Sequence, residues 1–221
     1  MLGDYELIEM LLHFAIPQKD TKLQAKNLFH HHDKSFNKLF QSDHNQLLIE
    51  RYGNKPMPKK RNEPPLYIAL IRLVSELIHR TVWEGIKNKP TISSQEELVR
   101  YLRSTIGYKS RECLKIFFLD SKNHIISRDS PYCSFEIDVT INDPAYIATS
   151  IRAITLQALL REALGVIIAH NHPSGDTEPS PADIRMTKDI DLALKLFDIT
   201  LQDHIIIGSQ GVYSMREHNF I

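Results

Sequence analysis

One segment constrains the fold of this chain more than any other. Residues 165–183, with the sequence GVIIAHNHPSGDTEPSPAD, start as a short apolar run and end in the tetrapeptide SPAD. A short apolar run of this kind is typical of a strand that is covered on both faces. In the tetrapeptide, Ser180 can cap a helix and Pro181 suits its first position, while Asp183 lies in the first turn, where the helix dipole favours an acid. The segment therefore predicts a buried strand, a turn and a helix over residues 181–197.

Two histidines stand at the end of this predicted strand. His170 and His172 are separated by one residue, and alternate side chains of an extended chain point to the same side. Asp183, at the start of the following helix, can supply a third ligand. Three protein ligands with one open position are typical of a catalytic zinc site. A helix cap accounts for Ser180 and Asp183 without any metal, and the two interpretations are compatible, so the histidine pair is what separates them.

The front of the chain is predicted to be helical. Apolar residues recur at helical spacing in residues 4–14, 21–32 and 66–84, and shorter helices are expected at 35–40 and 44–50. Residues 53–65, GNKPMPKKRNEPP, interrupt the pattern with proline. The stretch NKPTIS at 88–93 has the composition of a linker. We therefore expect a small all-α domain over residues 1–90 and a second domain over residues 91–221.

The second domain is predicted to mix strands with helices. Strands are expected at 113–120, 134–141, 165–170, 200–208 and 211–215, and helices at 94–104, 149–163 and 181–197. Residues 124–129, HIISRD, could pair with the first strand through the turn SKN. This order predicts an α+β or mixed α/β fold, in which helices flank a sheet of mixed strand direction.

Charge and composition exclude several classes of protein. The formal net charge is +0, with a small basic excess in residues 1–90, whereas a strong nucleic-acid binder usually carries a clear basic surplus. No apolar run reaches the ~20 residues that a membrane helix needs. The two cysteines, Cys113 and Cys133, fit a reducing compartment and lack zinc-ligand spacing. We therefore expect a cytoplasmic protein without a membrane contact; the oligomeric state is left open.

Residues 169–184, AHNHPSGDTEPSPADI, resemble the JAMM (MPN⁺) metal motif, in which His-x-His-Pro is followed by Ser-x-x-Asp. The sequences HNHPSGD (residues 170–176) and DHIIIG (residues 203–208) resemble the RadC-type branch of that family. The resemblance implies a JAB/MPN-like (cytidine-deaminase-like) mixed sheet with flanking helices. It also implies a Zn²⁺ site formed by His170, His172 and Asp183. Ser180 would then stabilise the oxyanion of a tetrahedral intermediate.

The resemblance also implies a general base. JAMM enzymes use an upstream glutamate on a strand that faces the metal site, and here residues 127–150 depart from the RadC-type pattern because they lack its Gly-Thr pair. Glu136 is the only glutamate in this segment, and Asp129 and Asp138 are alternatives. Because polar and apolar residues alternate around Glu136, the same position also suits a solvated strand carboxylate. We expect Glu136 to be the base.

The front domain resembles the helix-hairpin-helix region of the same family, in the residues GDYELIEMLLHFAIPQKDTKLQAKNLF. DNA-binding hairpins of that kind use a Gly-hydrophobic-Gly turn, whose backbone amides approach phosphate. Near that turn this chain offers only Gly53, among prolines that lack amide donors. Lys59, Lys60 and Arg61 could still contact phosphate nonspecifically. We therefore expect weak nonspecific contact with DNA, or none.

Two functions follow from these residues. The first is a zinc-dependent hydrolase of the JAMM type that cleaves a peptide or isopeptide bond in a peptide or protein substrate, with Glu136 moving the proton. The second is a DNA-associated accessory protein whose zinc domain is structural or catalytically degenerate. A zinc deaminase is excluded, because His-x-Glu and Pro-Cys-x-x-Cys are both absent from the sequence. A carboxylate close to the metal site distinguishes the first function from the second.

Overall fold

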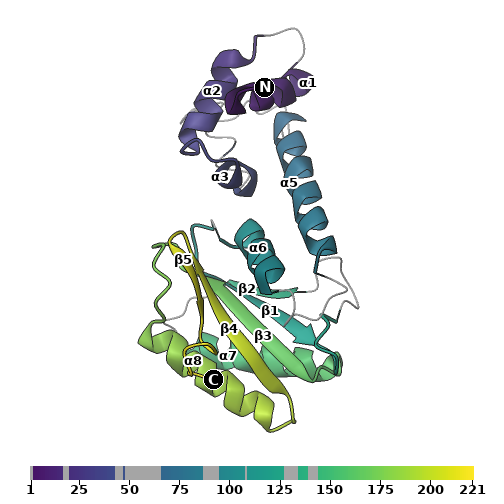
Figure 1. Ribbon diagram of the computed structural model, residues 1–221, viewed down its shortest axis with the longest axis vertical. Helices are drawn as coiled ribbons and strands as arrows, with labels where there is room; N and C mark the ends of the chain where they lie inside the picture. The colour runs from purple at the N-terminus through teal and green to yellow at the C-terminus, as the bar shows by residue number, and fades with distance from the viewer. Residues whose placement is uncertain are drawn as a thin grey trace. The chain divides into compact units, whose positions relative to one another are not determined.

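The computed structural model describes two compact units (Figure 1). The described residues are 2–16, 20–42, 47, 66–86, 95–107, 109–126, 134–138 and 144–221. The first unit is Met1–His79 and the second is Arg80–Ile221, so the division falls inside helix α5, Leu66–Glu84. The domain boundary expected near residue 90 lies outside the described residues and stays a prediction.

The first unit is helical, as the apolar spacing predicts. Its described helices are α1 (Asp4–Ala15), α2 (Lys22–His31), α3 (Phe36–Gln41) and the first part of α5. Their apolar stripes meet in one core that contains Ile8, Leu12, Ala25, Leu28, Phe29, Leu39, Leu47, Tyr67, Ile68 and Ile71. The short helix predicted at 44–50, apart from Leu47, and the proline-rich residues 53–65 lie outside the described part of the chain.

The second unit is built on a five-stranded sheet of mixed direction. Its strands are β1 (Cys113–Leu119), β2 (Ser134–Asp138), β3 (Gly165–Asn171), β4 (Thr200–Gly208) and β5 (Gly211–Ser214). They follow the order β2-β1-β3-β4-β5, in which β3 and β4 run parallel and the other neighbours run antiparallel. The parallel pair is connected through helix α8, as a parallel connection requires.

Helices cover both faces of this sheet (Figure 1). Alternate residues of a strand point to opposite faces. One face packs with α6 (Gln95–Thr105) and contributes Phe117, Ile167 and Ile205 to its core. The other packs with α7 (Pro144–Leu160) and α8 (Pro181–Lys195), through residues such as Ile116 and Ile168. The expected α+β fold, with a mixed sheet and flanking helices, is thereby confirmed.

Some boundaries differ from those predicted. Helix α7 begins at Pro144 instead of residue 149 and ends at Leu160 instead of residue 163. Proline suits the first turn of a helix, because its missing N–H would have no intrahelical partner there. The end is set by Glu162, whose φ of 55° is left-handed and cannot continue an α-helix.

Of the hairpin expected from HIISRD, the described residues show one bridge, between Leu119 and Ile125. The turn before it is held by Asp120, whose Oδ1 accepts hydrogen bonds from the backbone N–H groups of Lys122 (2.8 Å) and His124 (2.9 Å). Residues 127–133 lie outside the described part.

None of the described helices combines the length and the apolar character needed to cross a bilayer.

Candidate metal centre

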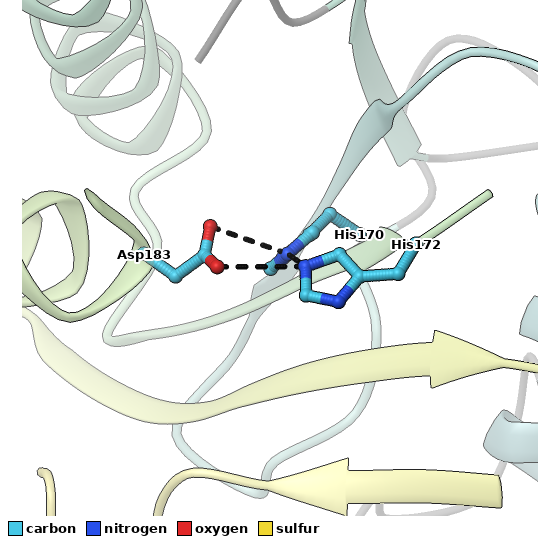
Figure 2. A group of neighbouring side chains, drawn as sticks. All are labelled: His170, His172 and Asp183. Carbon is cyan, nitrogen blue, oxygen red and sulfur yellow. Dashed lines mark hydrogen bonds and ion pairs between the residues drawn. The ribbon is translucent and has the colours of Figure 1, made fainter. Parts of the chain in front are cut away.

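The two histidines lie at the end of the central strand. All residues of β3 are buried, and His170 is 0% exposed. His170 stands in register with Leu114 of β1, whose side chain belongs to the core under α7 and α8. His172 follows the strand, and its backbone N–H donates to the carbonyl of Ile207 at 2.9 Å. That bond carries the β3–β4 pairing past the strand end and holds both imidazoles on one side (Figure 2).

Asp183 approaches the histidines from the first turn of α8. Ser180 is the N-cap of this helix, as predicted, and its Oγ accepts from the Asp183 backbone N–H at 3.2 Å. Asp183 returns the contact, because its Oδ2 accepts from the Ser180 backbone N–H (2.7 Å) and from the Ser180 hydroxyl (2.6 Å). This reciprocal cap fixes the rotamer of a carboxylate that is itself completely buried. The helix cap and the metal-ligand interpretation of Asp183 therefore coexist in the structure.

The three side chains converge on one point (Figure 2). His170 Nε2 and His172 Nε2 are 2.9 Å apart. Asp183 Oδ1 lies 3.3 Å from His170 Nε2, and Asp183 Oδ2 lies 3.4 Å from His172 Nε2. Two ligand atoms of a tetrahedral zinc site, each ~2.0–2.1 Å from the ion, are ~3.3 Å apart. Among the described residues, only these three form a group that could hold a metal ion.

The hydrogen bonds around the three side chains leave hydrogen-bond acceptors that face one another. His172 Nδ1 lies 2.8 Å from the carbonyl oxygen of Asp176, so Nδ1 carries the ring proton and donates it. A neutral His172 then has a lone pair on Nε2. Asp183 Oδ1 is buried and receives no hydrogen bond within the described part of the chain. Lone pairs gathered this closely repel unless a cation lies among them, so the residues fit a divalent metal ion.

Burial and charge favour the metal-binding protonation states of His170 and Asp183, whereas the hydrogen bond to Asp183 raises the pKa of His172, so a metal ion would displace a proton there. Burial lowers the pKa of His170 to about 4, which outweighs the opposite effect of the Asp183 charge. Burial by itself raises the pKa of Asp183, but the contact with His172, the charge that His170 carries in acid, and the hydrogen bonds from Ser180 bring it well below its usual range. His170 is therefore neutral and Asp183 ionised at pH 7, which are the states that bind a metal.

The turn between His172 and α8 is packed against the β4–β5 turn. Gly175 has a φ of 90°, a left-handed conformation that favours glycine. Its carbonyl lies so close to Gly208 that a Cβ added to Gly208 would be 2.3 Å away, and the same Cβ would lie 2.8 Å from Thr177 Cγ2. The backbone approach therefore positions the segment whose Asp176 carbonyl orients His172.

We expect Gly208→Ala to displace this turn and to weaken metal binding together with stability. An overpacked position of this kind costs ~1–3 kcal/mol of unfolding free energy. Denaturant unfolding and a chelator competition for Zn²⁺ measure the two effects. Gly211→Ala is the matched control, because a Cβ at Gly211 meets nothing within 4 Å. Equal stability and equal zinc affinity in the two variants would contradict the prediction.

A carboxylate that was not predicted as a site residue lies within electrostatic reach of the centre. Glu112 directly precedes β1 and is half-buried. Burial raises its pKa, the charge of His172 lowers it, and the charge of Asp183 raises it again. These interactions place Glu112 within electrostatic reach of two of the three metal-site residues. The signal in the sequence was an acid immediately before the strand CLKIFFL, but only the pairing of β1 with β3 brings that strand end to the histidines.

Asn171, between the two histidines, holds the segment that carries Glu112. It is fully buried. Its Oδ1 accepts from the Cys113 backbone N–H at 2.8 Å, and its Nδ2 donates to the carbonyls of Lys109 and Arg111, both at 3.1 Å. Three hydrogen bonds from one buried amide thus tie the residues on both sides of Glu112 to the metal-site strand.

The structure gives only backbone positions, or none, for the residues proposed as the base. Glu136 lies on β2 in register with Lys115, whereas His170 is in register with Leu114. Asp138 is in register with Cys113, and Asp129 lies outside the described residues. The side chains of Glu136 and Asp138 are also outside the described part, so the role assigned to Glu136 stays a prediction.

The hydroxyl of Ser180 allows a further prediction. Ser180→Ala removes both the cap and the bond to Asp183 Oδ2, and we expect it to lower the unfolding free energy by ~1 kcal/mol while zinc is retained. Chemical denaturation and metal analysis measure the two quantities. Ser180→Thr keeps the hydroxyl and serves as the control. A fully stable alanine variant would show that the cap contributes nothing.

One comparison with known proteins bears on this centre. Residues 92–220 match the family model of the RadC-like JAB domain. The match covers more than half of the chain and includes β1, His170, His172, Ser180 and Asp183.

Proposed function

The chain belongs to the RadC-like JAB domain family, and on this premise we propose that it is a zinc-dependent hydrolase that cleaves a peptide or isopeptide bond. The observation that supports the proposal is the buried group of His170, His172 and Asp183, with the half-buried Glu112 within electrostatic reach of it. A structural zinc site has four protein ligands and needs no base. Three ligands with an adjacent carboxylate are the composition of a hydrolytic site.

Nε2 of each histidine and the carboxylate of Asp183 would hold the ion. A bound Zn²⁺ lowers the pKa of a coordinated water and polarises the carbonyl of the substrate. The protein supplies fixed ligands for this purpose: the Asp176 carbonyl orients His172, and Ser180 orients Asp183. Zinc is preferred because two imidazoles and one carboxylate form the donor set of known catalytic zinc sites.

Glu112 is the group we assign to proton transfer in place of Glu136. A carboxylate with a raised pKa takes a proton from the attacking water and returns it to the leaving amine more readily than an exposed one. The pKa of Glu112 is raised by its burial, and Asn171 restrains its backbone on both sides. Ser180 donates its proton to Asp183 Oδ2 at 2.6 Å. To stabilise an oxyanion it would turn this proton toward the substrate.

The test uses the full chain, stripped with a chelator and reloaded with Zn²⁺. We expect one zinc ion per chain and cleavage of some members of a panel of peptides and isopeptide-linked conjugates, read by mass spectrometry, only in the reloaded protein. A chain that takes up no zinc contradicts the proposal. A chain that binds zinc and cleaves nothing supports the alternative of an accessory protein with a degenerate zinc domain. Duplex binding at increasing salt then examines the weak DNA contact proposed for the first unit.

A further inference from the structure

A second set of buried polar side chains lies behind His170. His170 Nδ1 is 2.7 Å from His204 Nε2, and His204 Nδ1 is 2.6 Å from the hydroxyl of Thr187. All three residues are 0% exposed. They belong to β3, β4 and α8, so the set connects the central strands to the helix that carries Asp183.

The donor and acceptor of each hydrogen bond in this set can be assigned by starting from Thr187. The Thr187 hydroxyl lies 2.6 Å from the carbonyl oxygen of Asp183, which can only accept. The single proton of Thr187 therefore points to that carbonyl. The sulfur of Met215, 3.3 Å from the same hydroxyl, is a more distant and weaker acceptor. The oxygen of Thr187 is left to accept, and His204 Nδ1 must carry the proton that it accepts.

The donors and acceptors of the bonds that involve His204 and His170 are then determined. A neutral imidazole has one protonated nitrogen and one lone pair. With its proton on Nδ1, His204 has a lone pair on Nε2 and accepts from His170 Nδ1–H. His170 in turn has its lone pair on Nε2, the atom that faces His172 and Asp183. The opposite direction would put a proton on His170 Nε2 and block that atom as a ligand.

We propose that Thr187 and His204 are positioning residues that fix the ring tautomer of His170, so that its Nε2 lone pair is available to the metal ion. The set begins at the backbone carbonyl of Asp183 and ends at His170. One helix turn therefore holds two ligands: Asp183 directly, and His170 through two intervening side chains. Outer partners of a metal-bound histidine commonly change metal affinity by ~10–100-fold when they are removed. The proposal rests on the metal site of the proposed function and does not require hydrolysis.

The first measurement needs no variant. Two-dimensional ¹⁵N–¹H correlation of the histidine rings in the metal-free full chain reports which nitrogen carries each proton. We expect His204 to be protonated at Nδ1 and His170 at Nδ1. A His204 ring with its proton on Nε2 would overturn the proposal. Because this readout uses the metal-free chain, it decides the proposal even if the chain binds no zinc and the proposed function fails.

The second measurement compares zinc affinity among variants by chelator competition. Thr187→Val removes the hydroxyl at nearly constant volume, and we expect the affinity for Zn²⁺ to fall ~10–100-fold. Thr187→Ser should restore it. Thr155→Val is the matched control, because Thr155 also donates to a carbonyl one helix turn earlier, that of Ile151 at 2.9 Å, on α7. Equal affinities of the two valine variants, or a serine variant as weak as Thr187→Val, would overturn the proposal.

Discussion

Replacing His170, His172 or Asp183 with alanine is expected to reduce bound zinc from one ion per chain to nearly none. The three ligand groups lie within 4.8 Å of one another, and no other group of this kind occurs in the part of the chain that the structure describes. A site with three protein ligands cannot lose one and keep its affinity. We expect a loss greater than the ~10–100-fold that follows from changes around the ligands. Metal analysis of the purified variants after zinc supplementation measures the stoichiometry.

His124→Ala is the matched control for this series. His124 also faces an aspartate, with its Nδ1 3.6 Å from Asp120 Oδ2, but no third ligand among the described residues accompanies the pair. We expect this variant to retain one ion per chain. Asp183→Asn tests the contribution of the negative charge of this ligand to zinc binding. The amide keeps the size of the side chain and loses the ionised oxygen. A triple alanine variant that binds zinc as the wild type does would show that the ion is held elsewhere.

The second large effect is expected on the rate of hydrolysis when Glu112 is replaced. Glu112→Gln should lower the rate of hydrolysis by ~10²–10⁴, because removal of a general base has effects of that size. Zinc content should stay at one ion per chain, since Glu112 is not among the three ligand residues. Protonation of Glu112 should lower the wild-type rate of hydrolysis at acidic pH and so give the rate profile an acidic limb. The glutamine variant should lose that limb.

Glu136→Gln, measured in parallel, distinguishes the two candidate bases. If the rate falls in Glu136→Gln and not in Glu112→Gln, the base is Glu136, as the sequence first suggested. If neither substitution changes the rate, proton transfer depends on another group. Metal analysis of both variants is the control, because a variant that loses zinc reports on the ligands instead of the base.

The sequence by itself determined the parts of this protein that depend on neighbouring residues. The strand that carries His170, the cap at Ser180 and the helix that starts at Pro181 are all present as predicted, and the strand runs one residue further, to Asn171. The alternation of side chains along a strand and the capping of a helix are local rules, so one segment of the chain brings His170, His172 and Asp183 together.

The boundaries of helices were less well determined than their existence. Helix α7 was predicted, but its start at Pro144 was missed, because an apolar pattern does not reveal which of several turns begins a helix. Of the strand predicted at residues 124–129, only residues 124–126 are described, and they form one bridge, from Ile125 to Leu119. The rest of that prediction lies outside the described part of the chain.

Only the tertiary structure decided what surrounds the ligands. Glu112 is far from the motif in sequence and reaches it because β1 pairs antiparallel with β3. His204 reaches His170 because β4 runs parallel on the other side of the same strand, and Thr187 joins them from α8. Strand order is a long-range property that no local pattern encodes. The ligands could therefore be predicted from one segment, whereas their base and their supporting hydrogen bonds could not.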